Sequence, residues 1–316
     1  MNRPSRRRVF GMLAGIGAAT LGLASTLRRT DAFEWRGSAL GGEARIVIDH
    51  PDRAVALRAC ERARAEIDRL EDEFSLFRPD SALSRLNGSG QIAAPSLDMR
   101  RVVEASLRFA KLSDGVFDVS IQPLWQAVAA AVEGRGDWTD VERAKRLVDW
   151  RRLRLDDRGL TLGLPGMALT FNAIAQGYIA DRVAAAMRAE GLDHVLIDAG
   201  ELRAIGSRRD LAPWRIGLDP SLSFDLEDGA VATSCGGASP FLPDGRLNHL
   251  IEPGTACSPS PERRVSVFAE DAMTADALAT VLCLVPSGEA VRLLREGGGR
   301  AAIIREDGGA IQRFRI

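Results

Sequence analysis

The chain has 316 residues, 46% of them hydrophobic, which is enough to bury a core in one large domain or two small ones. Its 42 Lys and Arg residues are balanced by 43 Asp and Glu residues, and only 5% of all residues are aromatic. Nucleic-acid-binding proteins usually have a basic excess and aromatic side chains that stack on bases, so we expect no nucleic-acid partner.

The N-terminus has the pattern of a targeting segment. Arg7-Arg8-Val9-Phe10 matches the twin-arginine pattern, and a mildly apolar run follows as far as residue 27. We predict a twin-arginine-type signal over residues 1–30, a periplasmic location, and a functional domain over residues 31–316. The alternative is an uncleaved membrane anchor, because about 20 apolar residues can just span a bilayer.

The first half of the chain mixes strand and helix patterns. Residues 44–48 have the composition of a short strand, and apolar residues recur at helical spacing over 54–74 and again over 97–113. Residues 140–165 predict a short helix and then a hairpin that turns at Asp157-Arg158-Gly159.

The stretch over residues 169–206 is the one around which the chain is organised. Asn172 is a candidate helix N-cap, because its side-chain oxygen can accept an N–H group of the first turn. Apolar residues then recur at helical spacing until Gly191, and residues 194–197 predict a short strand. The free N–H groups of such a helix start suit a phosphate group, although many α/β units share this pattern.

The second half of the chain adds strands, a helix and a terminal hairpin. We predict strands over residues 214–218, 230–234 and 265–269, a helix over 274–284, and a hairpin over 300–316 that turns at Asp307-Gly308-Gly309. This order predicts an α+β (mixed α/β) fold in which helices pack on mixed sheets.

The four cysteines have no CxxC spacing, so neither a zinc knuckle nor a thioredoxin-like site is indicated. Cys60 and Cys283 lie among apolar residues of predicted helices and are predicted core residues. Cys235 and Cys257 lie in predicted loops, and a disulfide between them in an oxidising compartment is an open alternative.

Two groups of residues could carry chemistry. Asp276 and Thr280 share one face of a predicted helix and offer the oxygen ligands that Mg²⁺ prefers, but on spacing alone a helix cap is the simpler interpretation of Asp276. His249 could act as a general base beside a phosphate or could be a buried structural histidine. Neither GxxxxGK[ST] nor GxGxxG occurs, so the commonest nucleotide-binding loops are absent from the sequence.

Several motifs follow one another in a distinctive order. They are Gly115-Val116-Phe117-Asp118, the turn over residues 170–178, Thr233-Ser234, His249-Leu250-Ile251-Glu252-Pro253 and Ala275-Asp276-Ala277-Leu278-Ala279-Thr280. This series resembles the ApbE family, the FAD:protein FMN transferases, over about residues 35–285. The resemblance rests on order and spacing rather than on a single motif, and it implies the flavin transferase fold of that family.

The resemblance also implies a site for FAD as substrate and for Mg²⁺. It implies that His249 is the catalytic base and that Asp276, Thr280 and the backbone carbonyl of Ala173 are the metal ligands. By the same resemblance, the flavin substrate is contacted by Leu40, Phe77, Val116, Phe117, Asp118, Thr170, Gln176 and Ile251. For Phe77, the alternative is a turn that Phe74 and Phe77 pack together.

The chain departs from the family pattern at several of these positions. Gln176 stands where the glycine turn of the family usually has a charged residue, and Thr170 stands where the family has the Asp that begins this turn. Glu252 replaces the Asp of the family's histidine motif, and Ala256 replaces a Gly. Residues 237–240 replace basic and aromatic residues that the family often has there. Gln176 can still donate to a ligand oxygen but carries no charge, so these departures bear on affinity and substrate choice more than on the fold.

The resemblance implies transfer of FMN to a partner protein. A threonine (or serine) hydroxyl of an acceptor protein would attack the FMN phosphorus of FAD, and AMP would leave. The expected acceptor is a membrane-associated redox protein. Two alternatives stay open, namely a periplasmic FAD pyrophosphatase, in which water replaces the hydroxyl, and a flavin-binding protein that has lost transfer.

Overall fold

The computed structural model describes residues 32–219 and 222–316, so the predicted signal segment over residues 1–30 lies outside the described residues. The helices are α2 (Arg53–Phe74), α3 (Ala82–Ser89), α4 (Leu97–Leu112), α5 (Gln122–Val132), α6 (Trp138–Lys145), α7 (Ala175–Ala189), α8 (Ala272–Leu284) and α9 (Ala290–Gly297). The strands of the first half are β1 (Phe33–Ala39), β2 (Gly42–Ile48), β3 (Gln91–Ile92), β4 (Leu153–Asp156) and β5 (Gly159–Leu162). Those of the second half are β6 (Val195–Asp198), β7 (Leu202–Ile205), β8 (Trp214–Asp219), β9 (Leu222–Leu226), β10 (Gly229–Cys235), β11 (Arg264–Ala269), β12 (Gly299–Arg305) and β13 (Ile311–Arg315).

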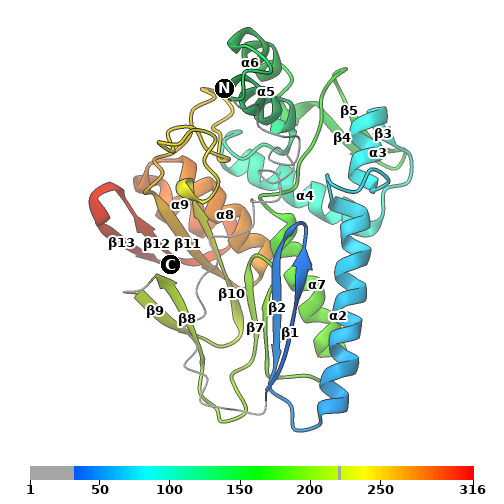
Figure 1. Cartoon of the computed structure of the whole chain (residues 1–316), viewed down its shortest axis with the longest axis vertical. Helices are drawn as coiled ribbons and strands as arrows, with labels where there is room; N and C mark the ends of the chain where they lie inside the picture. The colour runs from blue at the N-terminus through cyan, green and yellow to red at the C-terminus, as the bar shows by residue number, and fades with distance from the viewer. Residues whose placement is uncertain (1–31, 220–221) are drawn as a thin grey trace, which may run out of the picture.

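A large antiparallel sheet forms the centre of the described part of the chain, in the order β1-β2-β6-β7-β10-β11-β12-β13 (Figure 1). Two smaller sheets have the orders β3-β5-β4 and β8-β9. In the large sheet, β2 pairs directly with β6, so strands that are about 150 residues apart become neighbours, with Ile46 opposite Ile197. The large sheet therefore depends on pairing between strands that are far apart in the sequence, whereas β8-β9 and β12-β13 are local hairpins.

Alternation along the strands gives the sheet two apolar faces. Ile46 and Ile48 of β2 belong to the main core on the helical side, whereas Val47 between them packs with Trp214 and Ile216 of the β8-β9 hairpin. Successive strand residues point to opposite faces, so one strand serves both cores. The hairpin thus covers the face of the sheet that the helices leave free.

The helices α2, α7, α8 and α9 pack on the other face, where α8 contacts β10 and β11 and α7 contacts β6, β7 and α8. The helix α2 has an amphipathic pattern, and Asp52 caps it by accepting the Ala54 N–H at 2.8 Å. The helix α8 is apolar on nearly all sides and is buried throughout, which is typical of a core helix. Near the top of the view in Figure 1, α5 and α6 form a separate small cluster with Phe241 and Ile251.

Most of the predicted elements are confirmed, including the α+β class, the central helix and the terminal hairpin. The prediction that Asn172 caps the central helix is wrong. The helix α7 begins at Ala175, and its N-cap residue Ile174 makes no side-chain cap bond. The physical reason is a turn before the helix, in which the Ile174 and Ala175 N–H groups both donate to the carbonyl of Phe171.

All four cysteines are free, so the Cys235–Cys257 disulfide that the sequence left open is not formed. Cys60 and Cys283 are buried in the main core, as predicted. Within residues 32–219 and 222–316, none of the helices combines the length and the apolar character that a membrane crossing requires.

Candidate active site

A cavity of about 220 Å³ lies where the turn before α7, the strand β10, the helix α8 and the segment over residues 116–126 come together. Its lining includes all but one of the residues that the sequence singled out, namely Phe77, Val116, Phe117, Asp118, Thr170, Ala173, Gln176, His249, Ile251, Asp276 and Thr280. The volume is below the range typical of sites that bury a whole drug-sized ligand, so a dinucleotide would lie partly outside the cavity.

Three oxygen donors of this lining form the candidate metal site, and the first is the carbonyl of Ala173. In a regular helix, Gly177 would donate its N–H to this carbonyl four residues earlier. Here the Gly177 N–H donates instead to Oδ2 of Asp276 at 3.1 Å. As a result, no group in the described ranges donates a hydrogen bond to the Ala173 carbonyl. An orphaned carbonyl next to a buried carboxylate suits a cation.

Gly177 also explains why α7 and α8 can approach each other this closely. A Cβ atom added at Gly177 would lie 2.2 Å from the carbonyl oxygen of Ala272. Only glycine avoids this clash, so the sequence of the turn brings the Ala173 carbonyl and Asp276 to the same cavity.

The N-terminus of α8 is capped by residues other than Asp276. Asp271 accepts the Thr274 N–H at 2.8 Å. Asp181 of α7 accepts the N–H groups of the first two helical residues, both at 2.9 Å. Asp276 lies one turn further on, so the interpretation of this residue as a cap is wrong and its carboxylate remains available to the cavity.

Thr280 follows Asp276 on the same face of α8, and its hydroxyl lies 3.3 Å from that of Ser234 on β10. Both Asp276 and Thr280 are buried. Burial raises the pKa of Asp276 to about 7, against the lowering effect of the Gly177 N–H. In the described part of the chain, no three His, Cys, Asp or Glu side chains form a metal cluster. The candidate site therefore combines one carboxylate, one hydroxyl and one carbonyl, which fits Mg²⁺.

Glu201 is a further carboxylate in the lining, which sequence reasoning missed. It is buried, and its Oε2 accepts the Thr233 N–H at 3.1 Å. Burial and then the charge of Asp276 raise the pKa of Glu201 well above its usual range, while the Thr233 bond opposes this rise. Two buried carboxylates that repel each other would be stabilised by a cation. The available signal was a carboxylate directly after Gly200 in the tight turn between two apolar strands.

Gln176 lies against this same turn. A Cβ atom added at Gly200, whose φ is +97°, would lie 2.3 Å from Nε2 of Gln176, so glycine makes room for the amide. Gln176 is buried and lines the cavity, yet none of the described residues forms a hydrogen bond with its amide. The amide is therefore available to a ligand.

Asp118 and Thr170 line the cavity but are also engaged locally. Asp118 accepts the Ser120 N–H and hydroxyl at 2.8 and 2.7 Å and the Trp150 N–H at 2.9 Å. Thr170 donates its N–H to the carbonyl of Val119 at 2.8 Å, and its hydroxyl accepts the Asn172 N–H at 3.3 Å. Both residues thus hold the walls of the cavity in place. Phe117 is mostly a core residue, since its ring packs on that of Phe109.

The loop that carries His249 is held by a buried amide. Asn248 donates through Nδ2 to the carbonyls of Gly245 and Pro259 at 3.1 and 3.0 Å, and its Oδ1 accepts the Leu250 N–H at 3.1 Å. These bonds join both sides of the loop and fix the backbone next to His249.

The imidazole of His249 lines the cavity, and its backbone is held on both sides. The backbone N–H of His249 donates to the Ser239 carbonyl at 3.0 Å. The indole Nε1 of Trp125 donates to the backbone carbonyl of His249 at 3.2 Å. Its Nδ1 is buried and has no hydrogen-bond partner among the described residues. Burial lowers the pKa of His249 to about 4, with a partial offset from the Ser239 backbone. The ring is therefore neutral at pH 7 and has a lone pair that can accept a proton.

Glu252, which departs from the expected Asp, stabilises its own turn. Its two carboxylate oxygens accept the Gly254 and Thr255 N–H groups at 2.9 and 2.7 Å and the Thr255 hydroxyl at 2.6 Å. This departure is accommodated within the loop and leaves the position of the neighbouring Ile251 in the lining intact.

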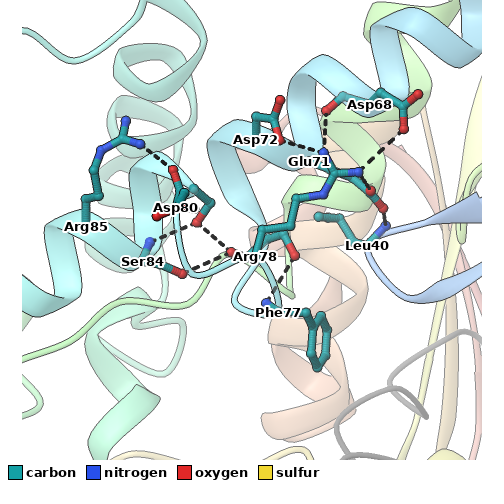
Figure 2. A network of polar contacts seen from close by, with 11 residues as sticks. Leu40, Asp68, Glu71, Asp72, Phe77, Arg78, Asp80, Ser84 and Arg85 are labelled. Atoms are coloured by element: carbon teal, nitrogen blue, oxygen red, sulfur yellow. Dashed lines mark hydrogen bonds and ion pairs between the residues drawn. The ribbon is translucent and has the colours of Figure 1, made fainter.

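Leu40 is the one predicted contact residue that does not line the cavity. Figure 2 shows how it is nevertheless linked to the segment that carries Phe77. The Leu40 N–H donates to Glu71 at 2.7 Å, Glu71 pairs with Arg78, and the neighbouring Phe77 N–H donates to the hydroxyl of Ser75 at 3.1 Å. The phenyl ring of Phe77 extends away from this network and remains partly exposed at the cavity.

Comparison with known proteins gives a consistent result. A model of the ApbE family matches residues 40–304. The FAD:protein FMN transferase of Vibrio cholerae is 34% identical over 244 residues, which cover 70% of this chain and 73% of that protein. The FAD:protein FMN transferase of Treponema pallidum is 29% identical over 301 residues, which cover 82% of each chain.

Solved structures share the fold. The flavin transferase ApbE from Vibrio cholerae superposes with a TM-score of 0.75 at 24% identity and covers 90% of this chain and 97% of its own. The apo form of the flavinyl transferase ApbE from Pseudomonas stutzeri gives a TM-score of 0.74 at 26% identity, with 90% and 95% coverage. The fold class predicted from the sequence is thus confirmed.

Proposed function

This chain belongs to the ApbE family, and from this premise we propose that it is a Mg²⁺-dependent FAD:protein FMN transferase. It would move FMN from FAD to a threonine or serine hydroxyl of a partner protein and release AMP. The observation that carries the proposal is the orphaned carbonyl of Ala173 beside Asp276 and Thr280 in one cavity. These oxygen donors suit Mg²⁺ better than they suit a softer metal.

The residues of the cavity would have different roles in the reaction. Ala173, Asp276 and Thr280 would hold the Mg²⁺, which supplies charge stabilisation on the phosphate oxygens when it is bound. The pyrophosphate would lie near the N-terminus of α7, where no side chain caps the helix. The apolar part of the lining would hold the flavin ring, and positioning would contribute much of the remaining rate enhancement.

His249 would act as the general base. The hydroxyl oxygen of the acceptor forms a bond to the FMN phosphorus, and the bond from that phosphorus to the bridging oxygen breaks. The hydroxyl proton goes to His249, and AMP leaves with the bridging oxygen. The neutral state of the buried imidazole supports this role, because a protonated imidazole could not accept the proton.

One assay separates this function from its two alternatives. The purified protein is incubated with FAD and Mg²⁺, with and without an acceptor protein, and AMP is measured. We expect AMP to be released only when an acceptor protein is present. We propose that the natural acceptor is a membrane-associated redox protein that carries a target threonine. Release of AMP without an acceptor would favour a FAD pyrophosphatase, and no release under either condition would favour a flavin-binding protein.

We expect Gln176→Ala to weaken FAD binding about five- to ten-fold, because the substitution removes a buried amide that is free to bond a ligand. The melting temperature without ligand should stay nearly unchanged, since no protein bond is lost. Titration of flavin fluorescence measures the first quantity and thermal denaturation the second. Gln312→Ala on the exposed edge strand β13 is the matched control and should have no effect. Equal FAD affinities for Gln176→Ala and its parent would make Gln176 a turn residue only.

We also propose that the twin-arginine pattern directs export to the periplasm. Replacing Arg7 and Arg8 by Lys should keep the protein in the cytoplasm, because the twin-arginine export pathway recognises the pair of arginines. Cell fractionation of the double variant and its parent measures this. An unchanged amount of the double variant in the periplasmic fraction would refute the proposal.

A further inference from the structure

Gln122 begins α5 and is one of the residues that line the cavity. Its relative exposure is 5%, yet its carboxamide makes no hydrogen bond with any of residues 32–219 or 222–316. The amide nitrogen and oxygen are not fully buried, so they retain accessible surface at the cavity that Gln122 lines. Polar groups of buried residues in folded proteins are nearly always bonded, so an amide without a protein partner at a cavity indicates a partner in the ligand.

The backbone beneath Gln122 is held firmly in place. The segment Val119–Ile121 forms a turn of 3₁₀ helix, which Asp118 caps by accepting the Ser120 N–H at 2.8 Å. The carbonyl of Asp118 also accepts the Ile121 N–H at 3.2 Å. Pro123 follows and has its own φ angle fixed by its ring. The amide is therefore presented from a rigid support, which lowers the entropy cost of ligand binding.

The residues of the lining that lie next to Gln122 are mostly apolar. Val119 and Ile121 precede it, and Trp125 lies one turn later on α5. Two polar residues lie nearby in the lining, namely Asp118, which accepts the N–H groups of Ser120 and Trp150, and Gln126, which is exposed one turn later on α5. Gln122 thus presents the unpaired amide of a buried residue within a largely apolar wall, so the ligand part that it meets should be largely apolar with one polar edge.

We propose that Gln122 is a specificity-determining residue that reads the imide edge of the flavin ring. This inference rests on the proposed function. A carboxamide places one acceptor and one donor side by side, and the imide of isoalloxazine presents an N–H group next to a C=O group in the complementary order. The remainder of the flavin ring has an apolar dimethylbenzene end that suits the surrounding wall. Adenine, the other ring of FAD, has polar atoms on all its edges and fits this wall less well.

The test compares FMN with FMN methylated at N3, the imide nitrogen, for the parent and for Gln122→Met. Methionine has a similar length without the amide, so the apolar wall should stay filled. We expect the parent to bind FMN about ten-fold more tightly than its N3-methyl derivative, as for one buried hydrogen bond. Gln122→Met should bind FMN about ten-fold more weakly than the parent and should not distinguish the two ligands. Flavin fluorescence in the presence of Mg²⁺ measures these affinities.

Two controls make the result specific. Gln312→Met changes an exposed glutamine of β13 that does not line the cavity and should retain the discrimination of the parent. The affinity for ADP, which lacks the flavin ring, should be the same for Gln122→Met and the parent by calorimetry. The melting temperature of Gln122→Met should not fall, because no hydrogen bond within the protein is lost.

The outcomes are distinguishable. If Gln122→Met still prefers FMN over its N3-methyl derivative as strongly as the parent does, the proposed contact does not exist. If Gln122→Met loses affinity for ADP instead of FMN, the amide serves the adenine, and the inference is overturned while the proposed function stands. If the parent binds neither FMN nor FAD, the proposed function fails, and this inference fails with it.

Discussion

Asp276→Asn is expected to reduce Mg²⁺-dependent AMP release at least a hundred-fold. The substitution keeps one oxygen but removes the only charged group among the three proposed metal ligands, and metal stabilisation of phosphate charge is worth several kcal/mol. The amide oxygen of the variant can still accept the Gly177 N–H, and a repulsive charge beside Glu201 is removed. The melting temperature without ligand should therefore not fall. A Mg²⁺ titration of AMP release measures the effect, and a chelator should reproduce it in the parent.

Asp271→Asn is the matched control on the same helix. Asp271 is the observed cap of α8, and Asn caps a helix about as well as Asp. AMP release should therefore survive this substitution. Thr280→Val should weaken Mg²⁺ dependence without abolishing it, because one neutral ligand is lost. If Asp276→Asn retains the Mg²⁺ dependence of the parent, the metal site proposed around Asp276 is wrong.

The same carboxylate predicts the pH dependence of metal affinity. Burial raises the pKa of Asp276 to about 7 in the absence of metal. Mg²⁺ binds the ionised carboxylate, so a proton competes with the metal below this pH. The apparent Mg²⁺ affinity of the parent should consequently rise as the pH increases through about 7. The Asp276→Asn variant has no such proton to lose and should lack this part of the pH dependence.

His249→Ala is expected to slow AMP release by about 10²- to 10⁴-fold while FAD still binds, because this is the usual contribution of a general base. The substitution removes no hydrogen bond from Nδ1 of the imidazole, and the loop is held by the backbone and by Asn248. Single-turnover rates at saturating FAD and an acceptor protein measure the effect. His50→Ala, a histidine outside the cavity, is the control.

The pH profile gives an independent check on the base. Burial lowers the pKa of His249 to about 4, so the imidazole is deprotonated throughout the neutral range. The rate at saturating Mg²⁺ should therefore show no loss near pH 6.5, where an ordinary histidine becomes protonated. A His249→Ala variant that turns over at the parental rate would leave His249 with a structural role only.

The elements and the order of the motifs could be read from the sequence. Helical spacing predicts α2, α4, α7 and α8, because this spacing is a local property of the chain, although the predicted Asn172 cap placed the start of α7 too early. The placement of Asp276 and Thr280 on one helix face follows from the same periodicity. The ordered series of motifs then indicated the ApbE family, to which the chain belongs.

The tertiary structure decided what depends on contacts between distant segments. Asp181 and Asp271 together cap α8, and this excludes a capping role for Asp276, although spacing alone favoured one. The predicted Asn172 cap is wrong because the N–H groups of Ile174 and Ala175 donate to the carbonyl of Phe171 instead. Glu201 and Gln122 became visible as site residues only once β7, β10 and α5 surrounded one cavity. Local propensity determines which segments form helices and strands, whereas burial, pKa shifts and unpaired polar groups arise only when residues far apart in the sequence exclude water together.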